Sequence, residues 1–158
     1  MCRLLGVIAN KPVDLEFSLL RADRPFRNFA KFNPDGWGLG WYENDKAQVF
    51  KRGLSAQYDP QFVELSKEVR SKIIIAHVRN ATTGNRSELN SHPFQYKNWI
   101  FAHNGSIEDW EFLFDLLEDK YKEKVKGETD SEVYFYWILQ CIEECGSTLK
   151  GIKKAVNK

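Results

Sequence analysis

Short runs of apolar residues fill the first two thirds of the chain, and apolar residues recur at helical spacing in the last third. β-branched and aromatic residues concentrated in such runs predict strands. The run 72–78 is nearly continuous in β-branched residues, which is typical of a strand buried on both faces. The runs that predict strands are 2–9, 37–42, 48–52, 72–78 and 98–103.

Turn-forming residues separate several of these runs and divide the strands from one another. Turns are predicted at 10–12, where the first strand should end, and at 33–36, which reads Asn-Pro-Asp-Gly. The polar residues 43–46 lie between two strand patterns and predict a hairpin. A longer polar loop is predicted from Arg79 to Ser91.

Two helices carry clear start signals. Asp59 followed by proline predicts an N-cap and a first helical position, opening a helix that ends near Val69. Thr129–Glu132 reads as a capping box for a helix that ends at Cys145, before Gly146. Weaker helical patterns are 15–30, which Pro25 should break or kink, 107–121 after a capping arrangement at Ser106 and Asp109, and 147–156. The predicted order is β-α-β-β-α-β-β-α-α-α, a mixture of the α+β kind.

Composition supports a folded domain and limits the binding partners and cellular compartment that we expect for it. The 158 residues, 42% hydrophobic and 14% aromatic, suffice for a single domain, 1–158, with a real core. A net charge of +1 with scattered Lys and Arg offers no attraction for nucleic acid or an anionic membrane. No apolar stretch reaches membrane-spanning length. Three cysteines are too few for a disulfide framework, so we expect a cytoplasmic protein.

Cys2 is the first candidate for chemistry. Removal of Met1 would leave a terminal cysteine, whose thiol and α-amine sit on neighbouring atoms. An α-amine has an unperturbed pKa of about 7.7–8.0, so near neutral pH it can accept the proton of its own thiol. The alternative is that Cys2 is simply a small apolar residue. The two readings differ in whether the chain also provides an oxyanion hole and a substrate clamp.

Arg79 ends a buried strand pattern and faces a polar loop, which makes it a candidate for binding a carboxylate in bidentate fashion. Thr82 in the same loop could add a hydroxyl group to that ligand, or could merely satisfy the turn. The alternative for Arg79 is an exposed side chain where the strand meets solvent.

Asn104-Gly105 also has two interpretations. Asn-Gly is a common turn dipeptide, yet a helical pattern follows it in place of a second strand, so a hairpin does not fit. The second interpretation is an oxyanion hole made by the Asn104 side-chain amide and the Gly105 N–H. Asp130 lies in the first turn of its helix, where the helix dipole favours a carboxylate; it could instead pair with a substrate ammonium group.

Other chemical residue types give weaker signals. The three histidines show no spacing typical of a metal site. Cys141 and Cys145 lie four apart on one helix face, as packing residues would. The glycine-rich stretch 36–40 falls within a strand, so a phosphate-binding loop is not indicated. The histidines are His77, His92 and His103.

Six stretches, taken in order, resemble the glutaminase domain of class II glutamine amidotransferases, which are N-terminal nucleophile hydrolases. The stretch 33–38 most resembles short stand-alone members, which include γ-glutamyl hydrolases. Many synthetase-linked members carry Trp and His where this chain has Asn80 and Thr83. The matching stretches are MCRLLG at 1–6, NPDGWG at 33–38, HVRNAT at 77–82, HPF at 92–94, HNG at 103–105 and GETDSE at 127–132.

The resemblance implies a cysteine-dependent hydrolysis of the γ-carboxamide of glutamine, or of a related γ-glutamyl amide, through a thioester. Cys2 would be the nucleophile, and Asn104 and Gly105 the oxyanion hole. It implies no metal and no organic cofactor. The residues it implies for substrate binding are Arg79 and Thr82 at the α-carboxylate and Asp130 at the α-ammonium group.

The resemblance also implies an αββα sandwich, whose second sheet needs strands after the helices. The last readable pattern is helical, so we expect a domain that is incomplete at its C-terminal end, with a complementing subunit as one source of the rest. Two further functions stay open. One is a glutaminase subunit that delivers ammonia to a separate synthase, since no acceptor domain is recognisable. The other is a non-catalytic binding or assembly module.

Overall fold

The computed structural model describes residues 2–157. The contacts within the chain divide it into two compact units, and the boundary in the sequence lies between Gly105 and Ser106. Each unit is described by itself. The first contains all strands of the described chain and two short helical segments besides one α-helix. The second is helical throughout its regular structure.

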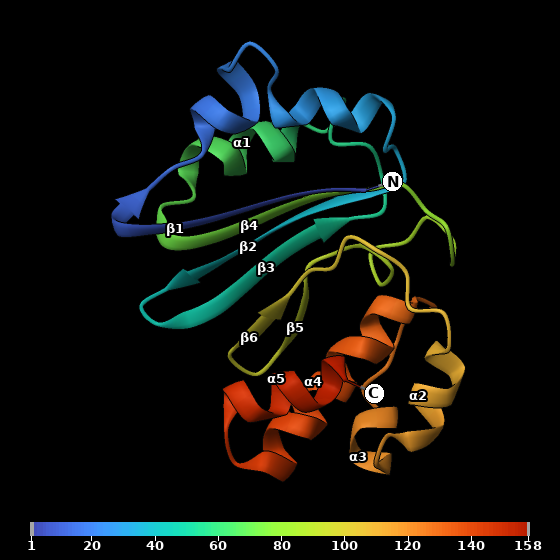
Figure 1. Cartoon of the computed structure of the whole chain (residues 1–158). Coiled ribbons are helices and arrows are strands. Elements are labelled where there is room, and N and C mark those ends of the chain that lie inside the picture. Colours follow the sequence, from blue (N-terminus) through green and yellow to red (C-terminus); the bar gives the residue numbers. More distant parts are fainter. Residues whose placement is uncertain (1, 158) are drawn as a thin grey trace. The chain divides into compact units, whose positions relative to one another are not determined.

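A four-stranded antiparallel sheet forms the centre of the first unit, with the order β1-β4-β2-β3 (Figure 1). β4 is thus an interior strand, paired with β1 on one side and β2 on the other. Arg3 and Trp37 both lie opposite Val78, which fixes the register across the three strands. The strands are β1 Arg3–Val13, β2 Gly36–Glu43, β3 Lys46–Arg52 and β4 Ser71–Arg79.

The β2–β3 connection confirms the predicted hairpin. Only Asn44 and Asp45 lie outside the strands, and both have positive φ, 49° and 60°. Two consecutive left-handed residues make the tight turn whose twist suits paired strands, and Asn and Asp tolerate that conformation best after glycine.

The turn predicted at 10–12 is wrong as a strand end. β1 continues to Val13, but its register with β4 shifts between Ile8 and Val13, so the pairing is irregular there. β1 lies at the edge of the sheet. Proline can be accommodated at an edge because no neighbouring strand needs its missing N–H. The turn-forming residues therefore distort the strand without ending it.

Three helical segments cover one face of this sheet (Figure 1). The helical pattern at 15–30 is broken before Pro25, as expected, and Pro25 is the N-cap residue of the second segment. Asp59 caps α1 as predicted, accepting a 3.0 Å hydrogen bond from the Gln61 N–H. Its other carboxylate oxygen accepts from Trp37 Nε1 at 2.9 Å and ties α1 to β2. The segments are η1 Phe17–Arg21, a π-helix, η2 Phe26–Lys31, a 3₁₀-helix, and α1 Pro60–Glu68.

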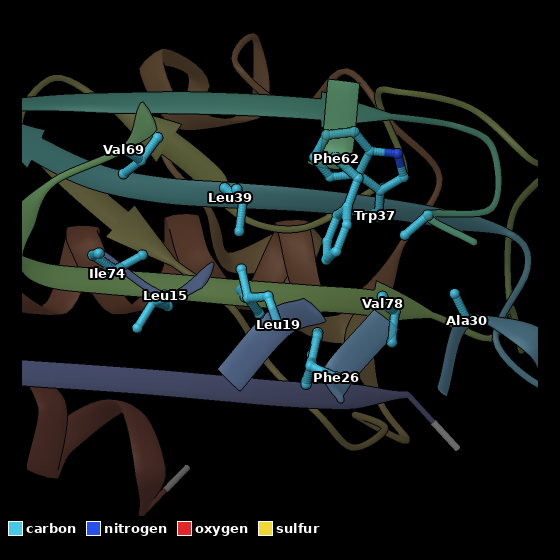
Figure 2. Close-up of a cluster of buried hydrophobic side chains, with 12 residues drawn as sticks. Leu15, Leu19, Phe26, Ala30, Trp37, Leu39, Phe62, Val69, Ile74 and Val78 are labelled. Carbon is cyan, nitrogen blue, oxygen red and sulfur yellow. The ribbon is translucent and has the colours of Figure 1, made fainter. Parts of the chain in front are cut away.

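The main apolar core lies between this helical layer and the sheet (Figure 2). Alternation along β2 and β4 sends every second side chain into it. Burial of such large apolar side chains supplies the dominant favourable term in folding. The core side chains include Leu15, Leu19, Phe26, Trp37, Leu39, Phe62, Val69, Ile74 and Val78.

The opposite face of β2 consists of glycines because another part of the chain presses against it. A Cβ on Gly38 would collide with the His92 carbonyl oxygen, and one on Gly40 would lie 2.8 Å from Ile100 and 2.9 Å from Pro93. Ile100 belongs to a two-stranded sheet, β5 Phe94–Tyr96 and β6 Trp99–Phe101. The strand predicted at 98–103 is thus shorter than expected, and β5 was not predicted.

The prediction that this strand is buried on both faces is confirmed only for the second half of β4. Ala76, His77, Val78 and Arg79 are buried, whereas Lys72 and Ile73 near its start are exposed. The buried half lies where the helical layer covers one face and the 91–93 segment approaches the neighbouring glycines on the other.

In the second unit the long helix α4 contacts the other three helices. The predicted N-cap opens it, with Thr129 Oγ1 accepting from the Glu132 N–H at 3.3 Å, and Gly146 closes it in the left-handed conformation. The Glu132 carboxylate does not complete a capping box but accepts from the N–H groups of Lys126 at 3.2 Å and Gly127 at 2.6 Å. Gly151 lets α5 approach closely, because a Cβ there would strike the backbone of Ile142. No helix among residues 2–157 is long and apolar enough to cross a membrane. The helices are α2 Trp110–Leu116, α3 Asp119–Lys122, α4 Asp130–Cys145 and α5 Thr148–Val156.

The helix predicted over 107–121 is wrong in its extent. It begins at Trp110 and breaks after Leu116, where the backbone groups bind a side chain of α4 in place of their own helix. Gln140 Oε1 accepts from the Glu118 N–H at 2.8 Å, and its Nε2 donates to the Leu116 carbonyl at 3.2 Å. This tertiary amide contact satisfies the groups that a helix break would otherwise leave without partners.

Candidate active site

Cys2 lies directly before β1, with its thiol held on the backbone of the residue that follows β4. Its Sγ accepts from the Asn80 N–H at 3.3 Å and donates to the Asn80 carbonyl at 3.4 Å. Since Arg3 is paired with Val78, Cys2 comes beside the end of β4. The thiol is half-buried, so it is fixed in place yet retains access to solvent.

Arg79 was expected just after the strand and is in fact the last residue of β4. It is only 3% exposed, so the solvent-facing alternative is wrong. The guanidinium donates to three consecutive backbone carbonyls of the following loop: Thr83 at 2.5 Å, Gly84 at 3.2 Å and Asn85 at 3.0 Å. A planar group with five donors suits such a fork of acceptors. Arg79 therefore organises the loop that follows the strand.

Asp35, in the 33–36 turn, fastens the same loop from the other side. Its carboxylate accepts from the Ala81 N–H at 2.9 Å and from Arg86 Nε at 2.5 Å, and its own N–H donates to the Arg79 carbonyl at 3.1 Å. Burial acts to raise the pKa of Asp35, but the Ala81 N–H and Arg86 outweigh it and hold the pKa below its ordinary value. Sequence reasoning gave Asp35 no role beyond the turn.

Asn104 and Gly105 follow β6, and both residues are exposed. No strand follows within the described residues, so the hairpin alternative is excluded. The ring of His103 packs beside Gly105, where a Cβ would lie 2.7 Å from His103 Nε2. A side chain at 105 would therefore require the His103 ring to move.

Thr82 and Asp130 are the two remaining residues predicted to bind substrate. Thr82 is exposed on the loop. Asp130 belongs to the second unit and is buried: one carboxylate oxygen accepts from the Ile107 N–H at 2.7 Å and the other from the Ser131 N–H at 2.8 Å. The structure thus gives Asp130 a backbone-holding role that the sequence did not indicate. The substrate roles of both residues stay predictions.

Two of the three histidines, His77 and His92, are buried next to each other. The rings of His77, in β4, and His92 lie 4.4 Å apart at an angle of 45°. Burial, and then the charge of Arg79, lower the pKa of His77 to about 3. Burial and the neighbouring His77 also hold the pKa of His92 well below its usual value. Both rings are therefore neutral near pH 7. Among the described residues no three His, Cys, Asp or Glu side chains gather as a metal would require.

Comparison with known proteins assigns the family. The family model "Glutamine amidotransferases class-II" matches residues 1–157. The chain belongs to the class II glutamine amidotransferases. A protein of Methanocaldococcus jannaschii is 36% identical over 150 residues, covering 91% of this chain and 39% of the relative. "Putative glutamine amidotransferase YafJ" of Escherichia coli is 30% identical, covering all of this chain and 62% of the relative. The chain therefore spans less than two thirds of the length of these relatives.

A solved structure supports the same fold. A glutamine aminotransferase class-II domain protein from Silicibacter pomeroyi aligns with a TM-score of 0.67 and 22% identity, covering 96% of this chain and 63% of that one. The predicted family, with its α+β fold of the N-terminal nucleophile type, is confirmed. Membership makes this a glutamine-utilising domain of an enzyme family.

Proposed function

We propose that this class II amidotransferase domain hydrolyses the γ-carboxamide of glutamine, or of a related γ-glutamyl amide, through a thioester on Cys2. The observation that carries the proposal is the position of the Cys2 thiol, 3.3 Å from the Asn80 N–H and beside the buried Arg79. A nucleophile fixed next to a carboxylate-binding group is the arrangement needed to orient an amino acid substrate.

The first step uses the two groups of the terminal cysteine. With Met1 removed, the Cys2 α-amine takes the thiol proton, and the thiolate attacks the γ-carbonyl carbon. The resulting tetrahedral oxyanion is stabilised by the Asn104 side-chain amide and the Gly105 N–H. Collapse of this intermediate breaks its C–N bond. The leaving nitrogen takes a proton from the α-ammonium group of Cys2 and departs as ammonia. Met1 itself lies outside the described residues.

The second step regenerates the enzyme. Water, deprotonated by the free α-amine, attacks the thioester through a second tetrahedral oxyanion, and its collapse returns the thiolate and frees glutamate. One water is consumed and one ammonia, or one amine from a γ-glutamyl amide, is released per turnover.

Arg79 is proposed to bind the substrate α-carboxylate. Its donors now serve neutral carbonyls, and a carboxylate forms stronger, charge-assisted hydrogen bonds to guanidinium. The substrate carboxylate would thus replace the carbonyls of residues 83–85 as the acceptor of the Arg79 N–H groups. Thr82, exposed on the same loop, would contribute its hydroxyl, and Asp130 would pair with the α-ammonium group.

The decisive experiment is labelling by 6-diazo-5-oxo-norleucine, a glutamine-like electrophile, followed by intact-mass measurement. We expect one adduct, on Cys2, and none in Cys2→Ala. The chain offers matched controls, because Cys141 and Cys145, like Cys2, form no disulfide within residues 2–157. Cys141→Ala and Cys145→Ala should both keep the adduct. An adduct that survives Cys2→Ala, or a protein in which Met1 stays attached, would refute the mechanism for this chain.

The oxyanion hole has its own prediction. Asn104→Ala should lower kcat by about 10²–10³-fold, the usual cost of losing one such donor. The assay is ammonia release from glutamine. A kcat within threefold of wild type would remove Asn104 from the mechanism. Measuring glutamate release, which both substrates share, from glutamine and from γ-glutamyl peptides would define the substrate class, and repeating it with and without candidate synthases would reveal any partner.

A further inference from the structure

The backbone that holds the Cys2 thiol is itself held from the opposite side by Asp35. Two consecutive peptide groups are involved, one joining Arg79 to Asn80 and the next joining Asn80 to Ala81. The first donates its N–H to Cys2 Sγ at 3.3 Å, and its carbonyl accepts from the Asp35 N–H at 3.1 Å. The second accepts from the Cys2 thiol at 3.4 Å and donates its N–H to the Asp35 carboxylate at 2.9 Å. Since a planar trans peptide points its N–H and carbonyl in opposite directions, each group lies between the thiol and Asp35.

Asp35 is a firm support because the turn that carries it is fixed at both ends. It directly precedes Gly36, the first residue of β2, which is paired with Arg79 in β4. On its other side, Asn33 Nδ2 donates to the Phe29 carbonyl at 2.7 Å. The turn is thus tied to β4 on one side and to η2 on the other.

The two carboxylate oxygens of Asp35 have different partners. Oδ2 accepts from the Ala81 N–H, whereas Oδ1 accepts from Arg86 Nε. The Asp35 side chain is only 14% exposed, but that of Arg86 is 62% exposed. An ion pair with an exposed arginine contributes little, because solvent screens it and the long side chain loses freedom. A carboxylate that accepts a backbone N–H forms a stronger, charge-assisted hydrogen bond, so the Ala81 contact should be the decisive one.

We propose that Asp35 is a positioning residue for the nucleophile, holding the peptide groups of residues 79–81 so that Asn80 keeps the Cys2 thiol in place. This inference rests on the proposed function, because Asp35 affects catalysis in this way only if Cys2 is the nucleophile. Asp35 acts through the backbone and is not itself a reacting group. Without it the two peptide groups gain freedom, and the thiol gains it with them. Placement matters because misplacing a reacting group by roughly 1 Å can cost on the order of 100-fold in rate.

Substitutions at position 35 separate position from charge. Asp35→Ala removes the acceptor of the Ala81 N–H, and we expect kcat for glutamine to fall by up to about 100-fold, with KM changed less. Asp35→Asn retains a carbonyl oxygen that can accept from the Ala81 N–H, so it should recover at least about tenfold of that loss. Asp35→Glu retains the charge but moves the carboxylate by one methylene group, so its kcat should stay below that of Asp35→Asn.

Two outcomes of this series would overturn the proposal. If Asp35→Glu is as active as wild type and Asp35→Asn is as impaired as Asp35→Ala, charge and not position decides. If KM rises in Asp35→Ala while kcat stays unchanged, Asp35 acts on the substrate-binding loop that follows Arg79 and not on the thiol.

Arg86→Gln is the matched control. It removes the partner of the other Asp35 oxygen and leaves the Ala81 contact in place. Its kcat should stay within about threefold of wild type, as expected for loss of an exposed ion pair. A loss equal to that of Asp35→Ala would overturn the proposal, since the ion pair would then be the determinant.

Amide hydrogen exchange measures the effect on the backbone directly. The N–H groups of Asn80 and Ala81 should exchange faster in Asp35→Ala, because the segment that carries them opens more readily. In Arg86→Gln both should exchange as in wild type. Unchanged exchange at Asn80 in Asp35→Ala would overturn the proposal, because the backbone that holds the thiol would not depend on Asp35.

If Asp35→Ala does not fold, Asp35→Asn and Asp35→Glu decide the question, because both keep a polar group at the position. The proposal requires a higher kcat in Asp35→Asn than in Asp35→Glu, and the reverse order overturns it. A wild-type protein without glutaminase activity or 6-diazo-5-oxo-norleucine adduct overturns the proposed function together with this inference. An active wild type with an unchanged kcat in Asp35→Ala overturns the inference alone.

Discussion

The two faces of the four-stranded sheet differ sharply in what they carry. On the face under the helical layer, Trp37, Leu39, Ile74 and Val78 build an apolar core. On the other face, the same strands present glycines, His77 and Arg79. Strand alternation allows this division because neighbouring residues point to opposite faces.

The contrast explains why this sheet suits chemistry. One face provides stability through apolar burial. The other holds polar groups, and the backbone of adjoining segments satisfies two of them, although the ring nitrogens of buried His77 have no hydrogen-bond partner among the described residues. Arg79 binds the 83–85 carbonyls, and Cys2 binds the Asn80 backbone. Substitutions on the two faces should therefore fail in different ways.

The largest effect on stability is expected on the helix-covered face. Phe62 is fully buried and meets the Trp37 ring edge-on at 5.1 Å. Phe62→Ala should lower the free energy of unfolding by about 3–5 kcal/mol through lost burial and a residual cavity. Phe17→Ala is the matched control, because Phe17 is 68% exposed, and it should stay within about 0.5 kcal/mol. Urea unfolding measures both; equal losses would refute the assignment of the core to this face.

The glycine face should resist any added side chain. Gly38→Ala would drive a methyl group into the His92 carbonyl, and we expect a loss of about 1–3 kcal/mol, as for overpacked cores. Gly6→Ala is the control, since a Cβ at Gly6 in β1 meets nothing within 4 Å. Thermal unfolding of the two variants separates them. A Gly38→Ala protein as stable as wild type would mean that the 91–93 segment can withdraw from the sheet.

Local signals in the sequence sufficed where the determining contact is also local. The N-cap at Thr129, the Asp59-Pro60 start and the Asn44-Asp45 turn each depend on neighbouring residues, and each is confirmed. The helix break after Leu116 depends on Gln140, which is 24 residues away. A pattern of spacing contains no information on that contact.

The candidate site divides in the same way. Strand ends and a terminal cysteine indicated Cys2 and Arg79 from their positions alone. The contacts of Asp35 with Ala81 and Arg86, and the packing of the His77 ring against the His92 ring, join segments far apart in the chain. Neither could be predicted from the strand pattern, because both depend on how the loops fold back over the sheet.

A dependence of stability on pH tests whether the buried histidines belong to the interior. The folded pKa of His77 is about 3, below the ordinary 6.5 of the unfolded chain. Between these values the unfolded state binds a proton that the folded state excludes, so stability is fully present above pH 6.5 and is lost as pH falls. His92 acts in the same direction. Each histidine should contribute roughly 1 kcal/mol per pH unit.

Urea unfolding between pH 4.5 and 6.5 measures this slope, in a window above the range in which Asp35 titrates. His77→Leu should reduce the slope by about half, because one of the two excluded protons no longer exists. The slope, unlike the absolute stability, is insensitive to any packing defect that leucine introduces. If wild type and His77→Leu lose stability in parallel, water or a local opening must reach His77 in the folded state. The sheet would then have one protected face and one that admits solvent to its histidines.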